Sequence, residues 1–249
     1  MSGMDWQSSA LTRALDRWLE EDIGRGDLTA SALQRKHGHA HWIAKQPGCF
    51  CGGPLVQQLF QRLDPEVSVH LLRDDGAAVE VGDRLLDLEG PATALVAGER
   101  TALNLAMRLS GIATATAELV AQLQGTGVRL ADTRKTTPGL RLLEKYAVRC
   151  GGGINHRMGL DDAAMLKENH IAWAGGITMA IAAVRSSAPW PARVIVEAET
   201  EAQATEAVQA GADGVLLDEF TPTQLIALVP RLRELSSRGV VLEASGVQP

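Results

Sequence analysis

A regular alternation of strand-like and helical segments after Gly127 constrains the fold of this chain more than any other feature. Each apolar run is short enough for a strand, and the segments between the runs have helical spacing. Strands separated by helices of this length pair in parallel, with right-handed crossovers. The pattern predicts about five strand–helix units without an internal sequence repeat. The runs are 128–131, 163–166, 194–198, 214–217 and 240–242.

The chain before residue 95 has a different pattern and predicts a small α+β unit. A first helix is expected to begin at Ser8 or Ser9 and to end near Gly24, and a second is expected to begin at Pro54. Residues 97–124 are rich in alanine and leucine and read as helical, with Ser110-Gly111 as a break between two helices. Strands are expected at 39–46, 67–72 and 84–89.

Composition excludes several classes of protein. No apolar run approaches the roughly 18 residues that span a bilayer, and the N-terminus lacks the pattern of a signal peptide. We therefore expect a cytoplasmic protein that does not bind membranes. The net charge of −6 argues against nucleic acid. Three cysteines in 249 residues argue against a disulfide framework.

Three groups could ligate a metal, but each also has a structural interpretation, which we favour. The cysteines can be small buried residues beside a turn, the acidic residues can cap and form a turn, and the alternating histidines can lie on a solvated strand edge. The groups are Cys49 with Cys51, then Glu21, Asp22 and Asp27, and finally His37, His39 and His41.

Polar side chains stand at the C-terminal ends of the predicted parallel strands. In a parallel barrel these ends open onto one face, where active sites form. We expect them to converge on one site. They are Asp132 to Lys135, Lys167, Glu197, Asp218, and Glu243 with Ser245 and Gly246.

The charges of this set favour an anionic small molecule. Between Asp132 and Arg157, six basic residues stand against two acidic ones, in a chain that is acidic overall. Glu197 and Asp218 suit hydroxyl groups or a hydrated Mg²⁺. Three glycines at 151–153 allow close approach of backbone to a ligand, and Ser245 with Gly246 could meet a phosphate. No nucleophile with a paired base is evident, so catalysis would depend on positioning and electrostatics.

At these residues the sequence resembles quinolinate phosphoribosyltransferase, the carboxylating nicotinate-nucleotide pyrophosphorylase of NAD biosynthesis. The resemblance implies an α/β fold with an N-terminal α/β sandwich domain (1–112) and an incomplete parallel α/β barrel (113–249), assembled as a homodimer. It also implies that quinolinate and phosphoribosyl pyrophosphate react with Mg²⁺ to give nicotinate mononucleotide, pyrophosphate and CO₂. The motifs are EDIGRGDLT, ERTALNLAMRLSGIAT, DTRKTTPGLRLLEKYAVRCGGG, NHRMGL, LKENHI and LLDEF.

The family pattern also implies roles for individual residues. It places Arg134, His156 and Arg157 on the quinolinate carboxylates, with Arg100 contributed by the partner subunit. It places Thr133, Lys135 and Lys167 at positions that contact substrate or phosphate, and Glu197 and Asp218 near the ribose and the metal. We therefore expect four catalytic residues, which are Lys135, Lys167, Glu197 and Asp218, and we expect Thr133, Ser245 and Gly246 to bind substrate.

The sequence departs from the family pattern at three places. Ile154 stands where a polar or aromatic residue is usual, and Glu219 stands where Asn is usual. The chain also stops after Pro249, where the family continues for about 35 to 40 residues, and we expect this to open a sheet edge and weaken phosphate binding. Two alternatives therefore stay open. One is a related phosphoribosyltransferase-like protein of other substrate, such as the relatives found with molybdate transport, and the other is a truncated, non-catalytic member.

Overall fold

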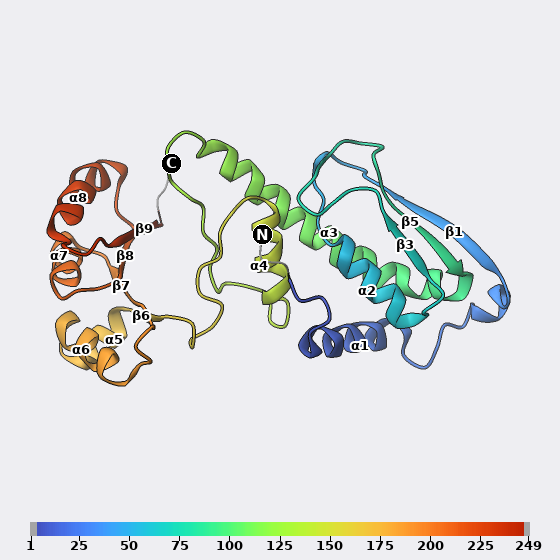
Figure 1. The fold of residues 1–249 in the computed structure, drawn as a ribbon, viewed down its shortest axis with the longest axis horizontal. Coiled ribbons are helices and arrows are strands. Elements are labelled where there is room, and N and C mark those ends of the chain that lie inside the picture. Colours follow the sequence, from blue (N-terminus) through green and yellow to red (C-terminus); the bar gives the residue numbers. More distant parts are fainter. Residues whose placement is uncertain (1–3, 247–249) are drawn as a thin grey trace. The chain divides into compact units, whose positions relative to one another are not determined.

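The computed structural model describes residues 4–246, and the chain divides into two compact units (Figure 1). Unit 1 extends to His156 and unit 2 begins at Arg157. Unit 1 reaches this far because Leu143 and Ala147, on the last helix before the division, belong to its hydrophobic core. The domain boundary at residue 112 stays a prediction.

Unit 1 contains a three-stranded antiparallel sheet in the order β1-β5-β3, and a small two-stranded sheet of β2 and β4. Its strands are β1 (His37–Ile43), β2 (Gly48–Cys49), β3 (Ser68–Leu71), β4 (Ala78–Val79) and β5 (Arg84–Pro91). Its helices are α1 (Ser9–Ile23), η1 (Ala30–Leu33, a 3₁₀ turn), α2 (Gly53–Leu63), α3 (Ala92–Gln122) and α4 (Arg141–Cys150).

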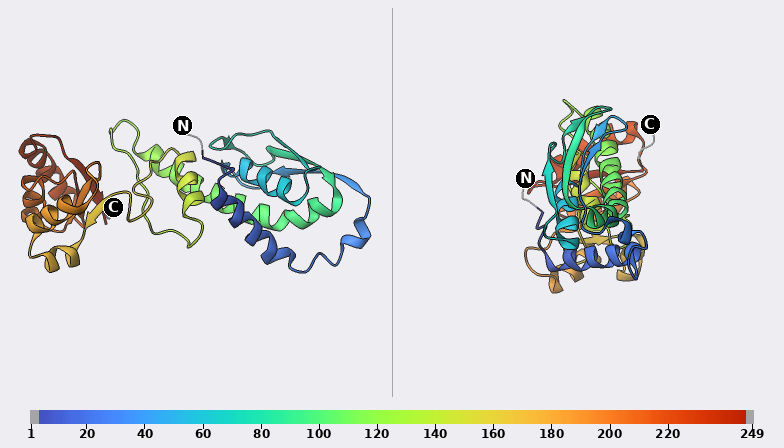
Figure 2. Two further views of the ribbon diagram at one scale, coloured as in Figure 1. Left: turned by 60° about the horizontal axis from the view of Figure 1, so that its bottom comes forward. Right: turned by 90° about the vertical axis from the view of Figure 1, so that its right-hand side faces the viewer.

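Helices α2 and α3 pack on the three-stranded sheet and form the sandwich that the resemblance implied (Figure 2). On α2 the apolar residues recur at helical spacing, so Leu55, Leu59 and Phe60 lie on one fully buried face. Leu105 and Leu109 of α3 contribute to the same core.

The predicted break at Ser110-Gly111 is wrong, because α3 runs without interruption from Ala92 to Gln122. The Ser110 hydroxyl accepts a hydrogen bond from Cys51 N at 3.0 Å and donates one to Cys51 O at 3.1 Å. These two hydrogen bonds explain a serine inside the helix, and Gly111 lies on the exposed side, where a glycine costs little stability.

The predicted strand at 128–131 is also wrong, because only a single bridge joins Ala131 to Ile154. Ile154 N donates to Leu130 O at 2.8 Å, and Asp132 N donates to Ile154 O at 3.1 Å. A strand needs a hydrogen-bonded neighbour along its length, and this segment pairs with another at a single residue. Val128, at its start, is 61% exposed.

Unit 2 is a parallel sheet in the order β6-β7-β8-β9, with its helices on one side (Figure 1). Each strand is added beside the previous one, as in an α/β barrel, so the predicted incomplete barrel is confirmed. Its strands are β6 (Ala164–Leu166), β7 (Val194–Ala198), β8 (Gly214–Asp218) and β9 (Val241–Ser245). Its helices are α5 (Glu168–Ala174), α6 (Ile177–Ser187), α7 (Glu201–Gln209) and α8 (Pro222–Leu235).

Buried aliphatic side chains on both faces of β7 explain its central place in this sheet. Val194 and Val196 point to one face and Ile195 to the other, and all three are buried. Between residues 4 and 246, no helix combines the length and the apolar character needed to cross a membrane.

Two glycine-to-alanine substitutions test the course of α3 and its packing. We expect Gly111→Ala to raise the free energy of unfolding by roughly 0.5–1 kcal/mol, because alanine favours the helix interior. We expect Gly151→Ala to lower it by about 1–3 kcal/mol, because a Cβ there would lie 2.3 Å from Ala113 O of α3. Urea unfolding followed by circular dichroism measures both, and equal effects of the two would contradict this packing.

Candidate active site

A buried ion pair organises the cationic stretch in unit 1. The Lys145 ammonium, on α4, contacts Asp132 Oδ1, and only 1% and 7% of the two side chains are exposed. Lys145 Nζ also donates to His156 O at 3.0 Å. A charge this deeply buried is stable only when it is paired and hydrogen-bonded, and both conditions are met.

The second half of this network ties Asp132 to the segment after the glycines. Asn155 Nδ2 donates to Asp132 Oδ2 at 2.6 Å and to Lys145 O at 2.8 Å. His156 N donates to Asp132 Oδ1 at 2.8 Å. The backbone at His156 is therefore fixed beside the loop that begins at Asp132.

Arg108 and Glu144 secure the other end of that loop. Arg108 Nε donates to Glu144 Oε1 at 2.8 Å, its guanidinium also contacts Thr137 Oγ1, and Thr137 N donates to Glu144 Oε2 at 3.1 Å. Burial raises the pKa of Glu144, but the hydrogen bonds from Arg108 and Thr137 outweigh burial and hold the pKa below its usual value. Sequence reasoning missed both residues, because a helical arginine and glutamate 36 positions apart carry no local signal of pairing.

Thr133, Arg134 and Lys135 lie on the loop between these two anchors. Thr133 Oγ1 accepts a hydrogen bond from Lys135 N at 3.0 Å. Thr133 and Lys135 are exposed and Arg134 is half-buried. The fixed backbone and accessible cationic side chains suit the binding of an anion.

The adjacent glycines contact protein rather than open space. A Cβ at Gly151 would lie 2.6 Å from Thr116 Cβ, and one at Gly153 would lie 2.7 Å from Val148 Cγ1. Gly152 has a φ of +88°, which glycine adopts without strain. Close packing against α3 and α4 therefore explains Gly151 and Gly153, where the sequence predicted close approach of a ligand.

In unit 2 the predicted polar residues stand at or near the carboxyl edge of the sheet, except Glu243, which lies in the middle of β9 opposite Leu216. Lys167 follows β6 directly, and its ammonium contacts Glu197 Oε2 of β7. Asp218 ends β8 opposite Ser245 of β9, whose hydroxyl contacts Asp218 Oδ1. The parallel register thus brings these four residues together in two neighbouring pairs.

Arg157 and Gly246 complete the set in unit 2. Arg157 Nη1 donates to Ala163 O at 2.9 Å, next to the start of β6. Gly246 is exposed and has a φ of +67°, beside Glu219, whose N donates to Ser245 O at 3.0 Å.

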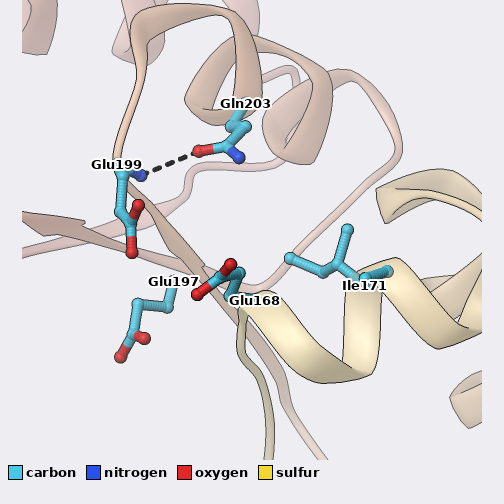
Figure 3. A pocket seen from close by; sticks show the side chains of 6 residues that line it. Glu168, Ile171, Glu197, Glu199 and Gln203 are labelled. Carbon is cyan, nitrogen blue, oxygen red and sulfur yellow. Dashed lines mark hydrogen bonds between the residues drawn. The ribbon is translucent and has the colours of Figure 1, made fainter.

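A pocket of about 160 Å³ opens at this edge of unit 2, between the ends of β6 and β7 (Figure 3). Gln203 Oε1 accepts a hydrogen bond from Glu199 N at 2.9 Å and fixes the turn above the pocket. Three carboxylates on one small cavity favour a ligand that offers hydroxyl groups or a hydrated cation. The lining residues are Glu168, Ile171, Ala172, Glu197, Glu199 and Gln203.

The residues predicted to form one site are divided between the two units. Arg100 is exposed on α3, and the loop residues and His156 also belong to unit 1. Arg157, Lys167, Glu197, Asp218, Ser245 and Gly246 belong to unit 2. Their convergence on one site stays a prediction.

The acidic turn and the histidines have the structural explanations that the sequence favoured. Asp27 Oδ1 accepts from Thr29 N and Thr29 Oγ1, each at 2.8 Å, and these bonds lower the pKa of Asp27. His37 and His39 are exposed, with Glu66 and Glu89 at 4.0 and 3.8 Å.

The fold is that of an α/β protein with charged and polar side chains at the carboxyl ends of its parallel strands. Sequence models of the quinolinate phosphoribosyl transferase N-terminal and C-terminal domains match residues 27–110 and 112–247. This chain belongs to the quinolinate phosphoribosyl transferase family.

Named relatives support this assignment. A probable nicotinate-nucleotide pyrophosphorylase [carboxylating] of Bacillus subtilis is 44% identical, over 95% of this chain and 81% of the relative. One of the same name from Synechocystis is 42% identical, over 93% and 79%. The crystal structure of NadC from Streptococcus pyogenes superposes with a TM-score of 0.91 at 38% identity, covering 98% of this chain and 86% of that one.

The buried pair predicts a large difference between two lysines of the same stretch. We expect Lys145→Met to lower the free energy of unfolding by about 3–5 kcal/mol, because Asp132 would keep its charge without a cation. Lys135→Met, at an exposed position, is the matched control and should change it by less than about 0.5 kcal/mol. Similar unfolding midpoints for the two variants would contradict the network.

Glu219 predicts a stabilising substitution. It has a φ of +58°, a conformation that asparagine adopts more readily than glutamate. We expect Glu219→Asn to raise the free energy of unfolding by about 0.5–1 kcal/mol, and Glu219→Gln, which removes only the charge, to give no such gain. Equal gains from the two variants in thermal unfolding would point to charge rather than backbone conformation.

Proposed function

We propose that this protein transfers the phosphoribosyl group from phosphoribosyl pyrophosphate to quinolinate, with decarboxylation, in de novo NAD biosynthesis. The products are nicotinate mononucleotide, pyrophosphate and CO₂. The observation that supports this most strongly is the cationic loop 133–137, in a chain of this family. The buried Lys145–Asp132 pair holds one end of the loop, and the partly exposed Arg108–Glu144 pair holds the other. Two polyanionic substrates must be held against their mutual repulsion, and a preorganised cationic loop lowers that cost.

We assign quinolinate to the cationic residues around the glycine loop. Arg134 and Arg157 can each bind a carboxylate through two N–H groups, and His156 can donate a further hydrogen bond. The Asp132 carboxylate supports this assignment, because it fixes the His156 backbone. Arg100, exposed on α3, is proposed to reach the site of the partner subunit in a homodimer.

The phosphoribosyl group is assigned to the strand ends of unit 2. Lys167 and Glu197 are already paired, so the glutamate holds the lysine at the carboxyl edge of the sheet, where it can meet a phosphate or carboxylate. Asp218 and Ser245 offer acceptors and a hydroxyl to the ribose or phosphate. Thr133, Lys135 and Gly246 add hydrogen-bond donors for phosphate oxygens.

The reaction needs positioning more than acid–base chemistry. The pyridine nitrogen attacks the anomeric carbon as pyrophosphate leaves, through a transition state with positive charge on the ribose. Glu197 and Asp218 are carboxylates that can stabilise that charge. The nitrogen of the product ring is then cationic and stabilises the carbanion left at the adjacent carbon when CO₂ departs. That carbon then takes a proton from water to give nicotinate mononucleotide. Lys167 and Lys135 neutralise the phosphates throughout.

Mg²⁺ is part of this proposal, and the residues at the carboxyl edge fit it. Mg²⁺ commonly binds one or two protein carboxylates together with substrate phosphates and waters. Glu197 and Asp218 offer such oxygens, and Glu168 and Glu199 line the same pocket as Glu197. When bound, the ion would neutralise the pyrophosphate oxygens and so favour departure of the leaving group.

A cytoplasmic location is also proposed. All three cysteines are free, including Cys49 and Cys51, which lie in the same short segment. Unpaired thiols are the rule in a reducing compartment. The alternatives of another substrate or of a non-catalytic member are not favoured, since carboxylating pyrophosphorylases are 38–44% identical over nearly the whole chain.

Turnover of the purified protein tests the proposal. We expect nicotinate mononucleotide to form from quinolinate, phosphoribosyl pyrophosphate and Mg²⁺, detected by chromatography.

Lys167→Ala and Arg134→Ala should each lower kcat/KM at least about 100-fold, since each removes a positive charge that is proposed to contact substrate. Arg193→Ala, at the opposite edge of the same sheet, and Arg129→Ala, on the exposed segment before the loop, are the matched controls and should retain full activity. Absence of product with folded protein would overturn the proposal, and unchanged kinetics in the first two variants would refute the site.

A further inference from the structure

The three cysteines of the chain are gathered in one place in unit 1, although about a hundred residues separate Cys150 from Cys49 and Cys51. Cys49 is the last residue of β2, Cys51 lies just after it, and Cys150 is the last residue of α4. Cys49 Sγ lies 3.8 Å from Cys150 O. The Cys49–Cys51 pair is a candidate for metal binding from sequence alone, but nothing in the sequence indicates that Cys150 and Asp75 lie beside it.

Asp75 adds a carboxylate to the cluster. One donor atom each from Cys51, Asp75 and Cys150 lie within 4.8 Å of one another, and among residues 4–246 these are the His, Cys, Asp or Glu side chains that form such a group. Two sulfurs on one tetrahedral zinc ion, with Zn–S bonds of about 2.3 Å, lie about 3.8 Å apart. The observed grouping therefore needs only small side-chain adjustments to close on an ion.

The donors are held by the surrounding backbone and by an outer hydrogen-bonding group. Asp75 Oδ1 accepts from Gly52 N at 2.9 Å and from Gly53 N at 2.8 Å, while Asp75 Oδ2 accepts from Tyr146 OH at 2.8 Å. An oriented ligand carboxylate with such outer partners is typical of metal sites.

The backbone of each cysteine ligand is fixed as well. Ser110 of α3 bonds to both the N–H and the C=O of Cys51. The Cys150 carbonyl packs so closely on Gly76 that a Cβ there would lie 3.1 Å from it. Cys51 is fully buried, whereas Asp75 and Cys150 are half-buried, which leaves an approach for an ion.

We propose that Cys51, Cys150 and Asp75 bind a zinc ion in unit 1, apart from the residues assigned to substrate. Two sulfurs and one carboxylate oxygen favour a thiophilic divalent cation over Mg²⁺, which prefers oxygen alone. Binding replaces the two thiol protons by the ion and releases them to solvent. The ion would join the segment after β2, the turn at Asp75 and the end of α4, directly before the glycine loop.

Zinc uptake by the full-length protein tests this proposal without reference to catalysis. The protein is purified with a chelator and a phosphine reductant, exchanged into chelator-free buffer and titrated with Zn²⁺. We expect one zinc per chain after gel filtration, and Co²⁺ in its place should give the near-ultraviolet charge-transfer absorption of thiolate ligands. That absorption separates this site from any binding at the carboxylates of unit 2.

Matched variants assign the ligands. Cys51→Ser and Cys150→Ser should abolish the thiolate absorption or weaken zinc binding at least tenfold, and Asp75→Asn should weaken it. Tyr146→Phe, which removes a hydroxyl that interacts with both Asp75 and Cys150, should weaken it roughly tenfold. Cys49→Ser and Asp74→Asn are the controls and should bind as wild type does, because the Cys49 thiol donates to a backbone carbonyl and Asp74 is exposed.

A measurement on the unmodified chain guards against variants that fail to fold. Zinc should slow alkylation of the accessible Cys150 by iodoacetamide, measured by peptide mass spectrometry, and Mg²⁺ should not. The proposal is overturned if folded, reduced wild type binds no zinc, if zinc leaves alkylation unchanged, or if both folded cysteine variants retain the cobalt spectrum.

Discussion

The ion pair between Lys145 and Asp132 is the interaction on which the candidate site of unit 1 depends. Burying two charges is costly, and a buried pair often adds little net stability. The pair matters here because it fixes positions. The Asp132 carboxylate holds the Asn155 side chain and the His156 backbone beside the segment that ends at residue 131. The cationic loop is thereby held before any substrate arrives, so binding costs less ordering of the chain.

A different constraint governs unit 2, where the register of the parallel sheet does the positioning. Leu166 pairs with Val196, and Asp218 pairs with Ser245, so the residues at or after these positions share one edge. Lys167 and Glu197 then meet without any motif linking them in sequence. Each unit thus prepares its own part of the chemistry by its own means, through a buried network in one and strand register in the other.

Periodicity predicted most of this architecture, and the failures had physical causes. The apolar runs of β7 and β8 are largely buried and have neighbouring strands, whereas the segment 128–131 has an apolar pattern but no neighbouring strand. Ser110 and Gly111 resembled a helix break because local propensity cannot register the bonds from Ser110 to Cys51.

For the site, charge and strand-end position indicated which residues to consider, and family resemblance supplied their roles. Neither could reveal pairs that form only through tertiary packing, such as Arg108 with Glu144, or Cys51 with Cys150.

The most direct test of the central claim follows the carboxyl carbon that quinolinate must lose as CO₂. With quinolinate labelled in the carboxyl group next to the ring nitrogen, labelled CO₂ should appear in equal amount to nicotinate mononucleotide, and only when phosphoribosyl pyrophosphate is present. Release of label without phosphoribosyl pyrophosphate, or no release from folded protein, would contradict the account.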